Sequence, residues 1–317
     1  MSRTRDLIQE ISEVRQRRRF GYAMAELPFR LFELERAFKE HDPKQRELTR
    51  YFPVALVAAI EGYFRMTCQE IVDAGEPYLA NAERLASSFK LDYSVLRALH
   101  GKSVSIGELV AHNIPLSRLD HVDSALSALL GFPFLERLRT ISDRWAHEAR
   151  GEPAAPMLQN PNETYALVGR VFELRHIVCH EIASAYSIEH EEVAASFEAC
   201  LRFLRASDEL VSETLRPGSP LTQSEMNVVA GESLRQSELE LETAVRELRA
   251  KLEGEELAAF DRAQQQWQEY CAALAEFEAF EVSGGTMWPT VRAGVAEAEV
   301  KRRTAQIKLF RRMGDQA

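Results

Sequence analysis

The chain has 317 residues, a length typical of two ordinary domains, with 45% hydrophobic and 28% charged residues. Those fractions are typical of a soluble globular protein. The formal net charge of −10 excludes a protein built to coat nucleic acid over its whole surface, so any contact with RNA requires a local basic patch. Two candidate patches occur, at residues 15–20 and 301–313, although such charge runs are more often solvated helix faces.

Cysteine usage and hydropathy favour an intracellular protein. The four cysteines form no CxxC pair and match no zinc template: Cys68, Cys179, Cys200 and Cys271. We expect them to be free, buried thiols in a reducing compartment. The N-terminal 20 residues carry charges throughout, and the longest apolar run, at 51–60, is too short to span a bilayer. The sequence therefore predicts a cytoplasmic protein without membrane contact.

Helical periodicity dominates the first part of the chain. Apolar residues recur at helical spacing between residues 3 and 40, which predicts one or two helices there. Residues 46–74 show a strong helical pattern. Shorter helices are expected at 79–89, 92–100, 105–112 and 118–130.

The rest of the chain continues the helical pattern. A proline-rich loop at 150–164 precedes helices expected at 165–186 and about 189–215. The segment RPGSP, at 216–220, is the clearest linker, so we expect a first domain at 1–215 and a second at 221–317. The second domain is expected to hold one long or two stacked helices (222–281), a turn (282–289) and a final helix (290–312). No strand pattern occurs, which predicts an all-α protein: a helical bundle followed by an extended helical domain.

The stretch ELRHIVCHEIASAY, at 173–186, concentrates residues that can do chemistry. On an ideal helix, one apolar face would hold Val171, Leu174, Val178, Ile182 and Ala185. The opposite side would carry two histidines and an acid: His176, His180 and Glu173. Arg175 falls near the edge of the apolar face, so a straight helix does not bring Arg175 beside His180. A helix start, a bend or a second subunit would be needed to bring these two side chains together.

Three interpretations of this stretch remain open. It could be a nuclease site, because imidazole can move protons near neutral pH and arginine offers a planar fork for phosphate. It could be a metal site, in which His176 and His180 supply two ligands and Glu173 a third. It could also be a buried helix whose polar face merely carries these residues.

The segment RHIVCH, at 175–180, fits the R-x4-H motif of HEPN-domain ribonucleases, with a polar residue after the arginine. The helix expected around 51–71 resembles the long earlier helix of that family, with Glu61 in its acidic position, and the helix at 191–211 resembles its closing helix. The resemblance covers roughly 46–215. It implies a homodimer in which two motifs face one cleft and cut RNA without a metal or other cofactor.

The resemblance also implies roles for individual residues. His180 would act as acid and base, Arg175 would bind phosphate, His176 would be a polar helper, and Glu61 would orient one of them. The products would carry 2′,3′-cyclic phosphate and 5′-hydroxyl ends. Proteins that join HEPN to a sensing module often act as toxins or phage-defence effectors that cut tRNA or mRNA. The alternative is a catalytically dead HEPN dimer that serves as a scaffold.

Some HEPN toxins are silenced by nucleotide transfer to a tyrosine shortly after the histidine. No tyrosine stands two places after His180, and the nearest is Tyr186. This departure argues against silencing of that kind in the present chain.

The second domain carries three ordered motifs. They are TQSEMN at 222–227, AQQQW at 263–267 and GGTMWP at 284–289. Together they resemble the LprI-type lysozyme-inhibitor domain, which implies a helical arm able to bind a protein trigger, inhibitor or lysozyme-like partner. Family members usually carry paired cysteines, including one soon after the asparagine, where this chain has Val228 and Val229. We expect Thr222 and Glu225 to form a capping box and Trp267 to pack in a helical core.

Overall fold

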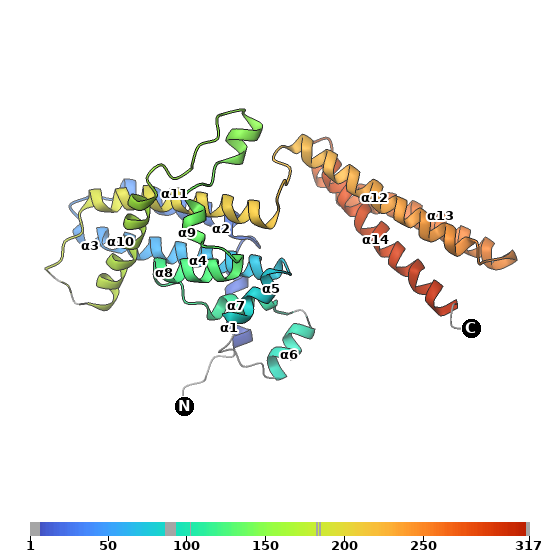
Figure 1. Cartoon of the computed structure of the whole chain (residues 1–317), viewed down its shortest axis with the longest axis horizontal. Helices are drawn as coiled ribbons and strands as arrows, with labels where there is room; N and C mark the ends of the chain where they lie inside the picture. Colours follow the sequence, from blue (N-terminus) through green and yellow to red (C-terminus); the bar gives the residue numbers. More distant parts are fainter. Residues whose placement is uncertain (1–6, 86–92, 102, 182, 184, 315–317) are drawn as a thin grey trace. The chain divides into compact units, whose positions relative to one another are not determined.

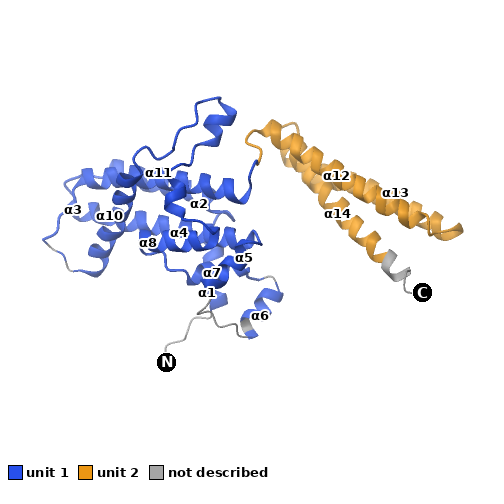
Figure 2. Cartoon of the chain, viewed as in Figure 1, with its two compact units in different colours: residues 1–218 blue, residues 219–317 orange. Residues whose placement is uncertain are grey.

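The computed structural model describes residues 7–85, 93–101, 103–181, 183 and 185–314 (Figure 1). Over these ranges the chain forms fourteen α-helices and no β-strand, which confirms the predicted all-α fold. The chain divides into two compact units, residues 1–218 and 219–317 (Figure 2). None of the described helices is both long enough and apolar enough to cross a membrane.

Over its described residues, the first unit is a bundle of eleven α-helices. Their bounds are α1 (Leu7–Gln16), α2 (Ala23–Glu40), α3 (Arg46–Thr49), α4 (Tyr51–Asp73), α5 (Tyr78–Asn81), α6 (Tyr93–His100), α7 (Ile106–Asn113), α8 (Leu119–Leu130), α9 (Phe134–Leu138), α10 (Pro161–His180) and α11 (His190–Leu215). A short 3-10 helix, Ala82–Arg84, follows α5, and a π-helix, Trp145–Ala149, follows α9.

Helix α4 is the centre of the first unit. It packs against α2, α7, α10 and α11. Its apolar side chains Leu56, Ile60, Phe64 and Ile71 are completely buried, as their helical spacing predicts. Burial of one such side chain stabilises the fold by about 1.5–3 kcal/mol, so this helix contributes a large part of the stability of the bundle. It also sets where α10, the helix with the candidate site, lies.

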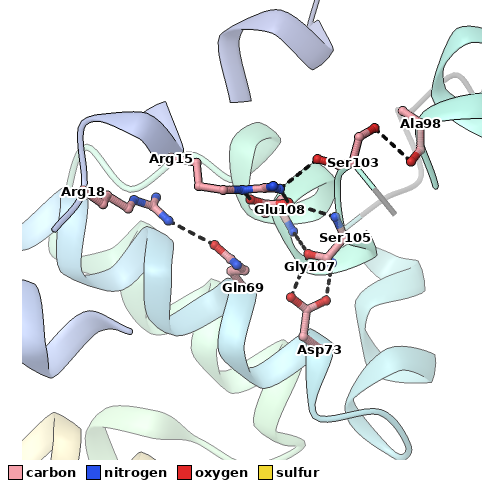
Figure 3. A network of polar contacts seen from close by, with 9 residues as sticks. All are labelled: Arg15, Arg18, Gln69, Asp73, Ala98, Ser103, Ser105, Gly107 and Glu108. Atoms are coloured by element: carbon pink, nitrogen blue, oxygen red, sulfur yellow. Dashed lines mark hydrogen bonds and ion pairs between the residues drawn. The ribbon is translucent and has the colours of Figure 1, made fainter. Parts of the chain in front are cut away.

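Helix α7 is attached closely to the end of α4 (Figure 3). The carboxylate of Asp73 accepts hydrogen bonds from the Gly107 backbone N–H at 2.8 Å and from the Ser105 hydroxyl at 2.7 Å. A Cβ atom at position 107 would lie only 2.4 Å from the Gln69 carbonyl oxygen. Glycine therefore allows the two helix backbones to approach.

Helix α1 is tied to α7 by an ion pair that Figure 3 also shows. Glu108 closes a capping box with Ser105 at the start of α7, and the Nε of Arg15 donates to Glu108 Oε1 at 2.9 Å. The same arginine donates to the Ser103 carbonyl oxygen at 3.0 Å. Ile11 of α1 is buried in a small cluster with residues of α6 and α7, separate from the main core.

The structure corrects the predicted extent of the helix that holds the candidate site. It begins at Pro161, within the predicted proline-rich loop, because proline suits the first position of a helix. It ends at His180, where the prediction ran to residue 186. Glu181 is extended, and the following segment is held by Arg50, which donates to the Ala183 carbonyl oxygen at 2.9 Å. Such tertiary contacts outweigh helix propensity.

Three further expectations differ from the structure. Ala185, predicted to lie on the apolar face, is exposed, and Ile182 lies outside the described residues. Helix α9 and the π-helix fall between the predicted break at 131–133 and the predicted loop at 150–164, where the sequence predicts no element. The helix expected at 79–89 is present as α5 and the 3-10 turn as far as residue 84, and residues 86–89 lie outside the described ranges.

The second unit consists of α12 (Gln223–Arg249), α13 (Gly254–Glu278) and α14 (Trp288–Gly314), with a short 3-10 helix at Phe280–Val282. The stretch 222–281 therefore forms two helices. Helix α14 packs against both α12 and α13. The predicted capping box is confirmed: Thr222 Oγ1 accepts from the Glu225 N–H, and the Glu225 carboxylate accepts from the Thr222 N–H.

Candidate functional site

Arg175 and Glu61 form a pair between α10 and α4. The Nη2 of Arg175 lies 3.9 Å from Glu61 Oε1, and the two side chains are 28% and 26% exposed. The packing of α10 on α4 produces this contact between residues that are 114 positions apart in sequence. The contact is an ion pair at the long end of the usual range, and the guanidinium stays partly exposed.

His176 and His180 form a second pair at the C-terminal end of α10. Their ring centroids lie 5.0 Å apart at an interplanar angle of 43°. Both side chains are exposed, and His180 is the last residue of the helix. The spacing of four residues places the rings on one face, as the sequence predicts.

The structure does not join these two pairs within one chain. Arg175 forms an ion pair with Glu61, and the ring of His180 contacts the ring of His176. Among the described residues, no hydrogen bond, ion pair or ring contact links Arg175 with His180. The angular separation inferred from the sequence is therefore present in the fold. A single copy of the chain presents the arginine and the histidine on different sides of α10.

A cleft of about 750 Å³ lies beside this part of α10. Arg175 and His176 line it from α10, and Ser117, Arg118 and Asp120 line it from the start of α8. Arg118 donates from Nε to Asp120 Oδ1 at 3.0 Å, and this hydrogen bond holds the pKa of Asp120 below its usual value. The charged and titratable groups of the cleft are thus the guanidinium groups of Arg175 and Arg118, the imidazole of His176, and the carboxylates of Asp120 and Glu173.

Sequence reasoning missed the contribution of α8 to the cleft. Ser117 and Arg118 stand more than fifty positions before Arg175 and belong to no motif. Only the packing of α8 against α10 reveals them.

Glu173, the third residue considered for a metal site, is engaged elsewhere. Its carboxylate accepts from Arg170 at 3.1 Å, and Arg170 also donates to Glu192 at 2.9 Å and to the Tyr186 hydroxyl. These hydrogen bonds, chiefly the one to Glu192, raise the pKa of Arg170. Within the described ranges, no group of three or more His, Cys, Asp or Glu side chains is arranged to hold a metal ion.

The basic patch at 15–20 makes mostly internal contacts. Arg15 pairs with Glu108, Arg17 with Glu13, and Arg18 donates to Gln69 at 3.2 Å. The patch at 301–313 makes similar contacts as far as residue 303. Lys301 and Arg302 pair with glutamates one helical turn away, and Arg303 donates to Gln264. The side chains of 311–313 lie outside the described part of the structure. These contacts favour the solvated helix face over an RNA-binding patch.

The described cysteines are all free, as predicted, but one differs in burial. Cys179 is exposed, next to His180, whereas the sequence predicts buried thiols throughout. Burial raises the pKa of Cys68 and of Cys200 to about 12, so these two thiols are not reactive at neutral pH.

In the second unit, two of the sequence motifs meet at one end of the helices. Asn227, near the start of α12, donates from Nδ2 to the Thr286 carbonyl oxygen at 3.1 Å. Its Oδ1 accepts from the Thr290 hydroxyl at 2.5 Å, and Gln223 donates to Thr290 Oγ1 at 3.0 Å. Gly284, at φ +75°, makes the turn that a side chain would strain. The motif residues thus fix the start of α12 against the start of α14.

The middle motif has a similar structural role. Gln264 is buried and accepts from Arg303 Nε at 3.0 Å. The guanidinium of Arg303 also lies 6.0 Å from the centre of the Trp267 ring. Trp267 is partly buried against the helical cluster of this unit, where the sequence predicts it to pack.

Comparison with known protein families finds one similarity, which lies in the second unit. Residues 217–307 match the family model described as lysozyme inhibitor LprI. No curated protein and no solved structure matches the chain. The match supports the resemblance drawn from the three motifs and covers almost the whole of the second unit. The HEPN resemblance of residues 46–215 stays a prediction.

Proposed function

We propose that the first unit is a metal-independent endoribonuclease of the HEPN type. The observation that carries this proposal is the position of His176 and His180 at the exposed end of α10, next to a cleft of about 750 Å³ that Arg175 and His176 line. This arrangement supplies what cleavage of RNA by its own 2′-hydroxyl requires: an acid and base, and a cation for the phosphate.

In the proposed mechanism, His180 moves a proton to or from the RNA oxygens, and Arg175 binds the phosphate through its planar fork. Glu61 orients that guanidinium from α4 across 3.9 Å, and His176 supports His180 from the preceding turn. The products carry a 2′,3′-cyclic phosphate and a 5′-hydroxyl. No step requires a metal or other cofactor.

The proposed active form is a homodimer. One chain presents Arg175 and His180 on different sides of α10, so a second copy would place its own α10 opposite and complete the site. The proposed substrate is tRNA or mRNA, and the proposed setting is the cytoplasm, where such an enzyme acts as a toxin or a phage-defence effector.

Growth of cells that express the protein tests this function. We expect expression of the wild type to stop growth and His180→Ala to restore it, because the mutation removes the proton-transfer group. Cys179→Ala is the matched control: it alters the neighbouring exposed side chain and should leave toxicity intact. Equal growth with wild type and His180→Ala would favour the non-catalytic scaffold.

The second unit supports a second function, binding of a protein partner. The match of residues 217–307 to the lysozyme-inhibitor family favours this role, with a lysozyme-like protein as the proposed partner. A partner of this kind would act as trigger or inhibitor of the first unit. In the scaffold alternative, the same partner would be recruited by a dimer without nuclease activity.

A further inference from the structure

One end of the second unit combines exposed apolar side chains with negative charge. We call this end, formed by residues 222–232 and 276–290, the acidic tip. It contains the start of α12, the end of α13 and the start of α14. The bonds of Asn227 hold the start of α12 to Thr286 and Thr290, and Arg292 of α14 donates to Glu276 at the end of α13. Because these bonds fix the backbone, the acidic tip is a preformed surface.

Large apolar side chains of the acidic tip face solvent. Phe277 and Phe280 are 77% and 76% exposed. Among the described residues, six of the ten exposed large apolar side chains of the second unit lie in this tip: Met226, Val228, Val229, Phe277, Phe280 and Met287. Exposed aromatic residues concentrated in this way are typical of protein interfaces.

The charge of the acidic tip has a single sign. Its two segments contain five glutamates and no lysine, arginine or histidine. Glu276 pairs with Arg292, which lies just outside the tip, at 2.6 Å, whereas Glu278 and Glu281 form no ion pair within the described structure. The opposite end of the same helices carries both signs, because segments 246–262 and 301–308 together hold eight basic and five acidic residues.

We infer that the acidic tip is the docking surface for a basic protein partner of the second unit. Phe277 and Phe280 would be the apolar anchors, and Glu278 and Glu281 would select the partner by charge. This inference rests on the proposed partner-binding function. The same charge disfavours RNA and an anionic membrane, because both would be repelled by unpaired carboxylates.

The exposed valines of the tip fit this assignment. Val228 and Val229 stand where the resembling family usually carries a cysteine, and both side chains are exposed. With 58% and 49% of their surface exposed, Val228 and Val229 lie outside the buried core of the unit. They extend the apolar area next to Met226 instead.

The test measures binding of the full-length protein to a purified c-type lysozyme, a basic protein, by titration calorimetry. Two tip variants are compared with the wild type: Phe277→Ser/Phe280→Ser and Glu278→Lys/Glu281→Lys. Matched controls at the opposite end of the unit carry equivalent changes at exposed positions: Leu309→Ser/Phe310→Ser and Glu255→Lys/Glu256→Lys. Circular dichroism confirms that each variant is folded.

We expect the wild type to bind, both tip variants to bind at least tenfold more weakly, and both controls to stay within about twofold. Added salt should weaken wild-type binding and affect the charge-reversed tip variant less. Equal affinity of the wild type and the tip variants would overturn the inference while partner binding itself would stand. Absence of wild-type binding would contradict both the inference and the proposed partner.

Discussion

Asp208, on α11, is a carboxylate whose burial links stability to pH. The Tyr63 hydroxyl donates to it at 3.4 Å. Burial raises the pKa of Asp208 to about 6, and the nearby charge of Glu70 adds to the shift. In an unfolded chain the same group titrates at about 4. Between about pH 4 and 6 the folded state therefore holds more protons, so the free energy of unfolding falls as the pH rises through this window.

Asp208→Asn should raise the free energy of unfolding at pH 7.5 by up to about 3 kcal/mol, because an amide carries no charge to bury. The gain should shrink toward zero as the pH approaches 4, where the wild-type carboxyl is protonated when folded. Urea unfolding of both proteins at the two pH values measures the effect. A gain of the same size at pH 4 would mean that titration of Asp208 is not its cause.

Some contacts of single residues could be predicted from the sequence, and others could not. The pairing of His176 with His180 follows from their spacing of four residues on one helix. The contact of Arg175 with Glu61 joins distant segments, and only the resemblance to a family pointed to both residues. The three partners of Arg170 were not predicted, because they come from two helices and a loop whose packing is a tertiary property.

At the scale of elements, the junction of α4 and α7 depends on one glycine. The ideal Cβ of an alanine at position 107 would lie 2.4 Å from the Gln69 carbonyl oxygen and 2.6 Å from the Asp73 carboxylate. Both obstacles belong to α4, and one of them is backbone, so the helices would have to separate.

Gly107→Ala should lower the free energy of unfolding by roughly 1–3 kcal/mol, the usual cost of overpacking. Gly62→Ala is the control: position 62 lies within α4 with nothing within 4 Å of the added Cβ, and alanine should stabilise the helix by roughly 0.5–1 kcal/mol. Urea unfolding compares the two variants with the wild type. Equal effects of the two substitutions would contradict the close packing of α7 on α4.

Most helices could be predicted from periodicity, and many of their ends agree with the structure to within one residue, but the ends of α10 could not be predicted. The pattern of α4 and the capping box of α12 are local, so the sequence predicts them well. The end of α10 at His180 depends on Arg50, more than a hundred positions away, which holds the Ala183 carbonyl. That end matters for the proposed mechanism, because it places His180 at an exposed helix terminus instead of in the middle of a longer helix.

At the scale of the whole molecule, the chain joins two units with different surfaces. The first presents a cleft with two guanidinium groups, an imidazole and two carboxylates, and the second presents an acidic, aromatic tip. With a net charge of −10, the chain could offer positive charge to the proposed RNA substrate only locally. Composition and motifs predicted the all-α class and the lysozyme-inhibitor resemblance, and neither could reveal the cleft, which forms only when α8 packs near α10.

The central claim is that the end of α10 cuts RNA without a metal. The most direct measurement incubates total RNA with purified wild-type protein and with Arg175→Ala/His180→Ala, in the presence of EDTA, and determines the chemistry of the fragment ends. The account predicts fragments from the wild type alone, ending in 2′,3′-cyclic phosphate and beginning with 5′-hydroxyl. Intact RNA with both proteins, or cleavage that EDTA abolishes, would contradict it.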